Sequence, residues 1–134
     1  MTTNTQPSNC THILHENGVH EFILANASID SYEAYMQELA KIYATRQPDD
    51  PPVRTLFDSS KINLPISYSM KRGKELMDRF PNVGKIRTAI LTDSVVEIRI
   101  VDSFVRLLRF SNTRLRFFDV SKRDEAVAWL LQED

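Results

Sequence analysis

The stretch VRTLFDSSKINLPIS, residues 53–67, joins a short strand to a polar loop and then to a helix. VRTLFD has the β-branched and aromatic side chains that favour strands, and Pro65 suits the first turn of a helix. One face of this helix holds Ile66, Met70, Gly73, Met77 and Phe80. The pattern predicts a β-α unit in which Gly73, lacking a side chain, lets the helix lie close to a sheet.

Residues 12–25, HILHENGVHEFILA, hold two apolar runs separated by an Asn-Gly pair. Asn-Gly favours a type I′ turn, so a β-hairpin with a two-residue turn is predicted. In that register His15 lies opposite His20, whereas His12 pairs with Ile23 on the other face. Because zinc sites usually use three or four protein ligands, we predict no metal site at this hairpin.

Further elements follow from the same patterns. Helical spacing predicts a helix over residues 28–46, beginning with a capping-box arrangement of Asp30 and Glu33. Ser121 is expected to cap a last helix that reaches residue 132. The additional predicted strands are KIRTAILT, residues 85–92, and RLRFFDV, residues 114–120.

Residues 95–110 fit two patterns. Alternating apolar residues fit a strand, and apolar residues three and four apart fit a helix. The length of the segment favours a helix, because strands usually have about 5 to 6 residues.

The alternation of strands and helices predicts an α/β fold. We expect a mixed, mostly parallel sheet of about five strands, with an antiparallel hairpin strand at one edge, and four helices. The chain of 134 residues suits one domain over residues 11–134. Residues 1–10 are expected to form a disordered tail in which Cys10 is an incidental exposed thiol.

Composition narrows the functional classes. No apolar run approaches the roughly 20 residues that span a bilayer, and the polar start lacks a signal-peptide core, so a cytoplasmic protein without membrane insertion is expected. The chain contains no G-x-S-x-G, HExxH or CxxC motif and only 3 glycines, which argues against an enzyme and against a bound cofactor.

Basic residues concentrate in the middle of the chain. Residues 1–60 hold 3 basic and 8 acidic side chains, and residues 61–116 hold 12 and 5. If residues 95–110 are helical, Arg99, Arg106 and Arg109 lie along one face, as a solvated surface or as anion contacts. The net charge of -1 and the lack of a binding motif weigh against nucleic acid.

Four segments together resemble a known family. They are NGVHEFILANASID, TLFDSS, KIRTAILT and RLRFFDVSKRDEAVAWL. In element order they are similar to the STAS domain of bacterial anti-sigma-factor antagonists and of sulphate-transporter tails, and more narrowly to small STAS/SEC14-like bacterial proteins. The resemblance implies a non-enzymatic regulatory module that acts through a protein partner, and it leaves a homodimer open.

The same resemblance suggests an alternative function, a carrier of a small apolar ligand. A carrier must keep a ligand pocket unfilled. We expect such a pocket, if present, to be lined by Met70, Met77 and Phe80.

In the anti-sigma antagonists a phosphorylated serine lies in an Asp-Ser-Ser/Thr-Gly motif at a helix N-terminus. Here Asp58-Ser59-Ser60 is followed by Lys61 instead of glycine. We therefore expect these hydroxyls to satisfy backbone groups of the loop. By position Ser67 is the better phosphoacceptor candidate and Ser59 the weaker one.

Overall fold

The computed structural model describes residues 9–60, 66–93 and 113–132. Five strands form one sheet in the order β1–β2–β3–β4–β5. Their bounds are Cys10–Leu14, Val19–Leu24, Val53–Asp58, Ile86–Thr92 and Thr113–Asp119. β1 runs antiparallel to β2, and the other neighbouring pairs are parallel. The predicted mixed sheet with an antiparallel hairpin strand at its edge is confirmed.

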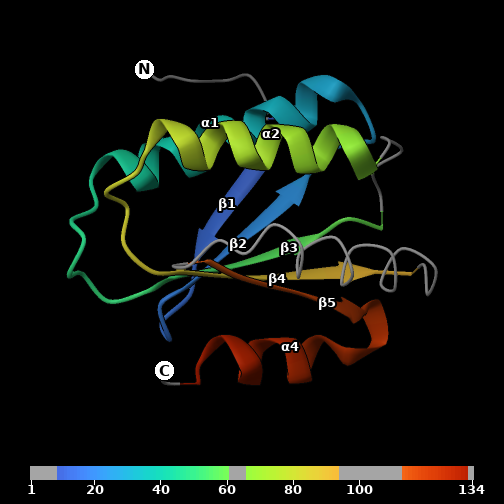
Figure 1. Cartoon of the computed structure of the whole chain (residues 1–134). Helices are drawn as coiled ribbons and strands as arrows, with labels where there is room; N and C mark the ends of the chain where they lie inside the picture. The colour runs from blue at the N-terminus through green and yellow to red at the C-terminus, as the bar shows by residue number, and fades with distance from the viewer. Residues whose placement is uncertain (1–8, 61–65, 94–112, 133–134) are drawn as a thin grey trace, which may run out of the picture.

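Helices cover both faces of the sheet (Figure 1). α1, Ile29–Ala44, and α2, Ile66–Arg79, lie on one face. α4, Arg123–Leu130, lies on the other and follows a 3-10 turn at Val120–Lys122. The described residues therefore contain three α-helices, and the predicted helix over residues 95–110 lies outside them.

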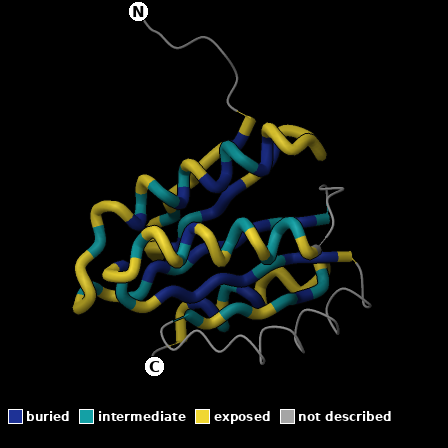
Figure 2. Tube along the Cα trace, turned by 45° about the horizontal axis from the view of Figure 1, so that its top comes forward, coloured by how far each residue is buried: buried dark blue, intermediate teal, exposed yellow. Residues whose placement is uncertain are grey.

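The sheet separates two apolar cores (Figure 2). The core under α1 and α2 is large and aromatic, and includes Phe22, Tyr32, Tyr35, Tyr43 and Phe57. The core under α4 is small, and Ala89 and Ala126 are fully buried in it. Small side chains allow α4 to approach the sheet closely. Among the described residues, no helix is both long and apolar enough to cross a bilayer.

The hairpin register differs from the predicted one. Leu14 lies opposite His20 and His12 opposite Phe22, a shift of one residue. The amide of Gly18 donates to the carbonyl of His15 at 2.9 Å, and Gly18 has a φ of 88°. The loop thus has three residues ending in a left-handed glycine, a common hairpin alternative to the two-residue turn.

Two predicted helix caps are also wrong. α1 is capped by Ser28, whose side chain accepts from the amide of Ser31, so the helix begins before Asp30. At the C-terminal end, the carboxylate of Asp119 accepts from the amide of Ser121 and starts the 3-10 turn. In both places another polar residue nearby offered an equivalent oxygen.

Cys10 is likewise not in an exposed tail. It is the first residue of β1, pairs with Leu24, and is only 3% exposed. Burial, above all, raises the pKa of its thiol to about 11. A thiol with that pKa is a poor nucleophile at neutral pH.

Candidate ligand-binding site

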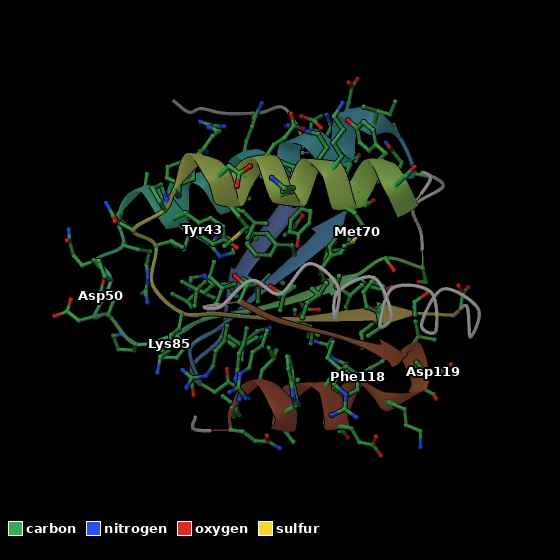
Figure 3. The ribbon with its side chains drawn as sticks, viewed as in Figure 1. Tyr43, Asp50, Met70, Lys85, Phe118 and Asp119 are labelled. Carbon is green, nitrogen blue, oxygen red and sulfur yellow. The ribbon has the colours of Figure 1, made fainter. Side chains whose placement is uncertain are left out.

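An apolar cavity of about 150 Å³ lies between α1, α2 and the sheet and is partly open to solvent. Figure 3 places Tyr43 and Met70 in this space between the helices and the strands. Residues of α1 that line it are Tyr32, Tyr35, Met36, Leu39 and Tyr43. Residues of α2 are Ser69, Met70, Gly73, Lys74, Leu76 and Met77. The strands contribute residues of β3, β4 and β5, including Phe57, Thr88 and Phe117.

The α1 wall of the cavity is rigid and aromatic. Its lining residues recur at intervals of three and four, so they share one face of the helix. Tyr35 stacks on Phe57 with ring centroids 4.2 Å apart and an angle of 6°. Tyr32 meets the ring of Tyr35 edge-on at 5.7 Å. These contacts hold the tyrosine rings in fixed positions along the wall.

The α2 wall has a gap at Gly73. A Cβ built on Gly73 would meet no atom of the described residues within 4 Å beyond its own turn of helix. The prediction that this glycine lets the helix lie close to the sheet is therefore wrong, because the helix stands off and leaves space. Met70 and Met77 lie on either side of Gly73 and line the cavity, as expected for a ligand pocket. Phe80 instead packs on Tyr43, and the centroids of the two rings lie 6.2 Å apart.

Most polar groups around the cavity already have partners. The hydroxyl of Thr88 lies 3.0 Å from that of Thr55, and the hydroxyl of Ser59 donates to the carbonyl of Leu91 at 2.9 Å. The ammonium of Lys74 bonds the carboxylate of Asp78 at 2.9 Å. The lining therefore offers apolar surface, aromatic faces and few free polar atoms.

Burial keeps the cavity tyrosines protonated. It raises the pKa of Tyr32 to about 12 and raises that of Tyr35 well above its usual value. The pKa of Tyr43 is raised by burial as well. At neutral pH these phenols are uncharged hydrogen-bonding groups and cannot act as bases or as nucleophiles.

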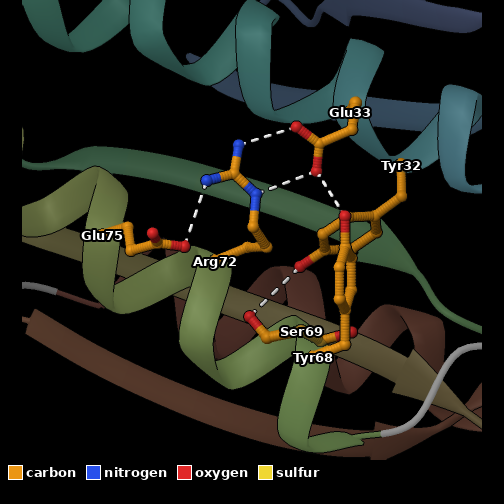
Figure 4. A network of polar contacts seen from close by, with 6 residues as sticks. All are labelled: Tyr32, Glu33, Tyr68, Ser69, Arg72 and Glu75. Atoms are coloured by element: carbon orange, nitrogen blue, oxygen red, sulfur yellow. Dashed lines mark hydrogen bonds and ion pairs between the residues drawn. The ribbon is translucent and has the colours of Figure 1, made fainter.

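A polar cluster ties α1 to α2 beside the cavity (Figure 4). The guanidinium of Arg72 donates to both carboxylate oxygens of Glu33, at 2.8 and 2.7 Å. The hydroxyl of Tyr68 donates to the same carboxylate at 2.7 Å, and that of Tyr32 donates to the carbonyl of Ser69 at 3.4 Å. These bonds, the first of them from Arg72, lower the pKa of Glu33. A bidentate pair fixes the relative orientation of the two helices.

The serine loop lies at the end of β3. Ser59 is 8% exposed, and both the amide and the hydroxyl of Ser60 donate to Asp58. Ser67 is exposed in the first turn of α2. The loop hydroxyls thus satisfy local groups, and phosphorylation at Ser67 or Ser59 stays a prediction.

The predicted anion contacts Arg99, Arg106 and Arg109 lie outside the described residues. Two other arginines, which the sequence did not indicate, bond to carbonyls at the C-terminal end of α4. Arg54 donates to the carbonyl of Leu130 at 2.7 Å, and Arg87 donates to that of Trp129. They satisfy the last carbonyls of α4, where a positive charge is favourable.

The hairpin histidines are arranged differently from the prediction. Because of the shifted register, Nε2 of His12 lies 2.8 Å from Nδ1 of His20, while His15 bonds Glu21. Burial, followed by the neighbouring His12, lowers the pKa of His20. Among the described residues, no group of three or more potential ligands could hold a metal ion.

The comparisons with known proteins add no relative: no family model, curated protein or solved structure matches this chain. The cavity itself was only partly foreseen. Sequence reasoning named two methionines but not the tyrosines of α1 or the inward residues of β5. A usable signal was present, because three tyrosines on one helix face lie opposite a glycine on another.

Proposed function

We propose that the protein is a non-enzymatic cytoplasmic binding module that holds one small, mostly apolar ligand in the cavity beneath α2. The observation that carries the proposal is the space beside Gly73, walled by aromatic and methionine side chains. Its volume of about 150 Å³ is similar to that of an apolar protein cavity that accepts benzene. The volume lies below the roughly 300–1,000 Å³ of drug-sized pockets, so the ligand is small.

The lining supports binding rather than catalysis. Its phenols are protonated, and its one ammonium, on Lys74, is paired with Asp78. Methionine side chains adapt their shape to a ligand and make favourable contacts with aromatic rings. The resemblance to STAS/SEC14-like proteins agrees with a carrier or a ligand sensor.

The test is toluene binding, measured by chemical-shift changes and by thermal stabilisation. We expect wild-type protein to bind toluene and Gly73→Leu, which places a side chain in the cavity, to lose binding while keeping its helical circular dichroism. Lys71→Leu is the matched control, because position 71 is exposed on the same helix. Absence of binding by wild type, or equal binding by Gly73→Leu, would refute the proposal.

A second candidate function is the regulatory protein-interaction module that the resemblance implies. Apolar surface on the hairpin favours it. α4 packs against β3, β4 and β5, while Ile13 and Ile23 on β1 and β2 are each 37% exposed. Ile23→Lys should then reduce capture of a partner from host extract, or reduce self-association in light scattering, without changing toluene binding.

A further inference from the structure

Two phenol groups on the cavity wall lack a hydrogen bond. Tyr35 and Tyr43 are 4% and 5% exposed, and both line the cavity. Within the described part of the chain, no hydrogen bond is made by either hydroxyl. Tyr32 differs, since its hydroxyl reaches the carbonyl of Ser69.

Neither hydroxyl is fully enclosed, and each still lacks a protein partner, so it is satisfied only if water or a ligand bonds to it from the cavity. Ring packing does not explain these two oxygens, since phenylalanine would supply the same stacking on Phe57 and the same edge contact with Phe80. Native proteins satisfy such groups with protein, with water or with a ligand. Here both groups belong to the wall of the candidate binding site.

The charge of the lining restricts the ligand. Burial raises the pKa of Tyr35 and of Tyr43, so both phenols remain neutral at neutral pH. Among the described lining residues the ammonium of Lys74 is the one cationic group, and Asp78 neutralises it. A carboxylate or phosphate would lose its hydration in this cavity without gaining an ion pair.

We infer that the ligand is a small uncharged molecule with an apolar body and one oxygen-bearing head, such as a phenol, an alcohol or a carbonyl compound, anchored by the hydroxyl of Tyr35 or of Tyr43. The aromatic and methionine wall holds the body, and the anchoring phenol exchanges a hydrogen bond with the oxygen. This ligand class rests on the proposed function, which requires only that the cavity binds an apolar molecule.

The test compares toluene with phenol, which have nearly the same shape and differ in a methyl against a hydroxyl group. Dissociation constants are measured for wild type, Tyr35→Phe, Tyr43→Phe and the double variant. We expect phenol binding to weaken roughly tenfold when the anchoring hydroxyl is removed, whereas toluene binding is unchanged or tighter. Tyr68→Phe is the matched control, because it removes a tyrosine hydroxyl that lies outside the lining of the cavity.

The outcomes separate the two claims. If the phenol-to-toluene affinity ratio is equal in wild type and in the double variant, the anchoring role is overturned. In that case, toluene binding by wild-type protein still leaves the proposed function intact. The anchoring role is also overturned if Tyr68→Phe shifts the ratio as much as the other variants do. If neither compound binds wild-type protein, the proposed function fails and the inference fails with it.

Discussion

Gly73 and Gly84 occupy opposite environments, although both are small residues close to the same core. Gly73 is helical, and a Cβ there would meet nothing within 4 Å in the described part of the chain beyond its own turn of helix. Gly84 has a φ of 84°, and a Cβ there would lie 3.0 Å from the carbonyl oxygen of Pro48. The first glycine is unfavourable for its helix, and the second is required by its backbone.

Gly73→Ala should therefore raise the free energy of unfolding by about 0.5–1 kcal/mol, because alanine restricts the unfolded chain and fits the helix. Gly84→Ala should lower it by about 1–2 kcal/mol through backbone strain. Urea unfolding of both variants beside wild type measures the two effects. A Gly73→Ala variant less stable than wild type would mean that α2 lies closer to the sheet than described.

At the level of single residues, spacing identified the inward positions but not their roles. The apolar stripe of α1 follows from helical periodicity, and its tyrosines Tyr32, Tyr35 and Tyr43 are all buried. Whether a buried phenol finds a partner depends on the facing helix, which local sequence does not specify. Tyr32 meets a carbonyl of α2, and Tyr35 meets a ring of β3.

At the level of elements, α4 is joined to β2 by one buried carboxylate. Glu21 accepts two hydrogen bonds from Arg123, at 2.8 and 2.6 Å. Nε2 of His15 lies 2.8 Å from Oε1 of the same carboxylate. Its side chain is 10% exposed, whereas that of Arg123 is 45% exposed. The hydrogen bonds from Arg123 are the main cause that lowers the pKa of Glu21 below its usual value of 4.5.

A lowered pKa in the folded state means that the ionised carboxylate stabilises the fold above pH 4.5, and that this contribution is lost as pH falls through the folded-state pKa. Glu21→Gln should cost about 1–2 kcal/mol at neutral pH and should show a smaller decline of stability on acidification. Urea unfolding across this pH range tests both parts. Glu16→Gln, at an exposed position of the hairpin loop, is the control. Parallel acid profiles for Glu21→Gln and wild type would contradict the assignment.

Element identity was predictable from the sequence, but element registration was not. The strands and their order along the chain follow from apolar runs and from the Pro, Gly and Asn residues that separate these runs. The hairpin turn does not, since an Asn-Gly pair suits both a two-residue turn and a three-residue loop that ends in a left-handed glycine. A shift of one residue moves each side chain to the other face, which brought His12 beside His20.

At the level of the whole molecule, the two faces of the sheet are filled differently. Ala89 and Ala126 close the α4 side, and the carbonyls that end α4 are satisfied by Arg54 and Arg87. The other side is thicker, with bulky aromatic side chains on α1 and a gap on α2. The α4 face is therefore packed with small side chains, whereas the other face contains the cavity.

The aromatic side also makes the protein sensitive to alkali. Burial raises the pKa of Tyr35 and of Tyr43, so both phenols stay protonated in the fold at a pH where they ionise in the unfolded chain. Stability is therefore fully present below the ordinary pKa of 10 and falls as pH rises above it, because unfolding then releases protons.

Tyr43→Phe keeps the ring and removes one of these ionisable groups. Relative to wild type, it should be more stable at about pH 11 than at about pH 8, because one proton fewer is released on unfolding. Urea unfolding at the two pH values measures this difference. Phenolate absorbance is the independent check, and in wild type it should rise together with the loss of helical circular dichroism. If Tyr43 ionised inside the folded protein, the absorbance would rise first with the helical signal intact, and that early rise would be missing from Tyr43→Phe. Such a result would place the Tyr43 hydroxyl in bulk water instead of on the apolar wall of the cavity, and would remove it as an anchor for the ligand.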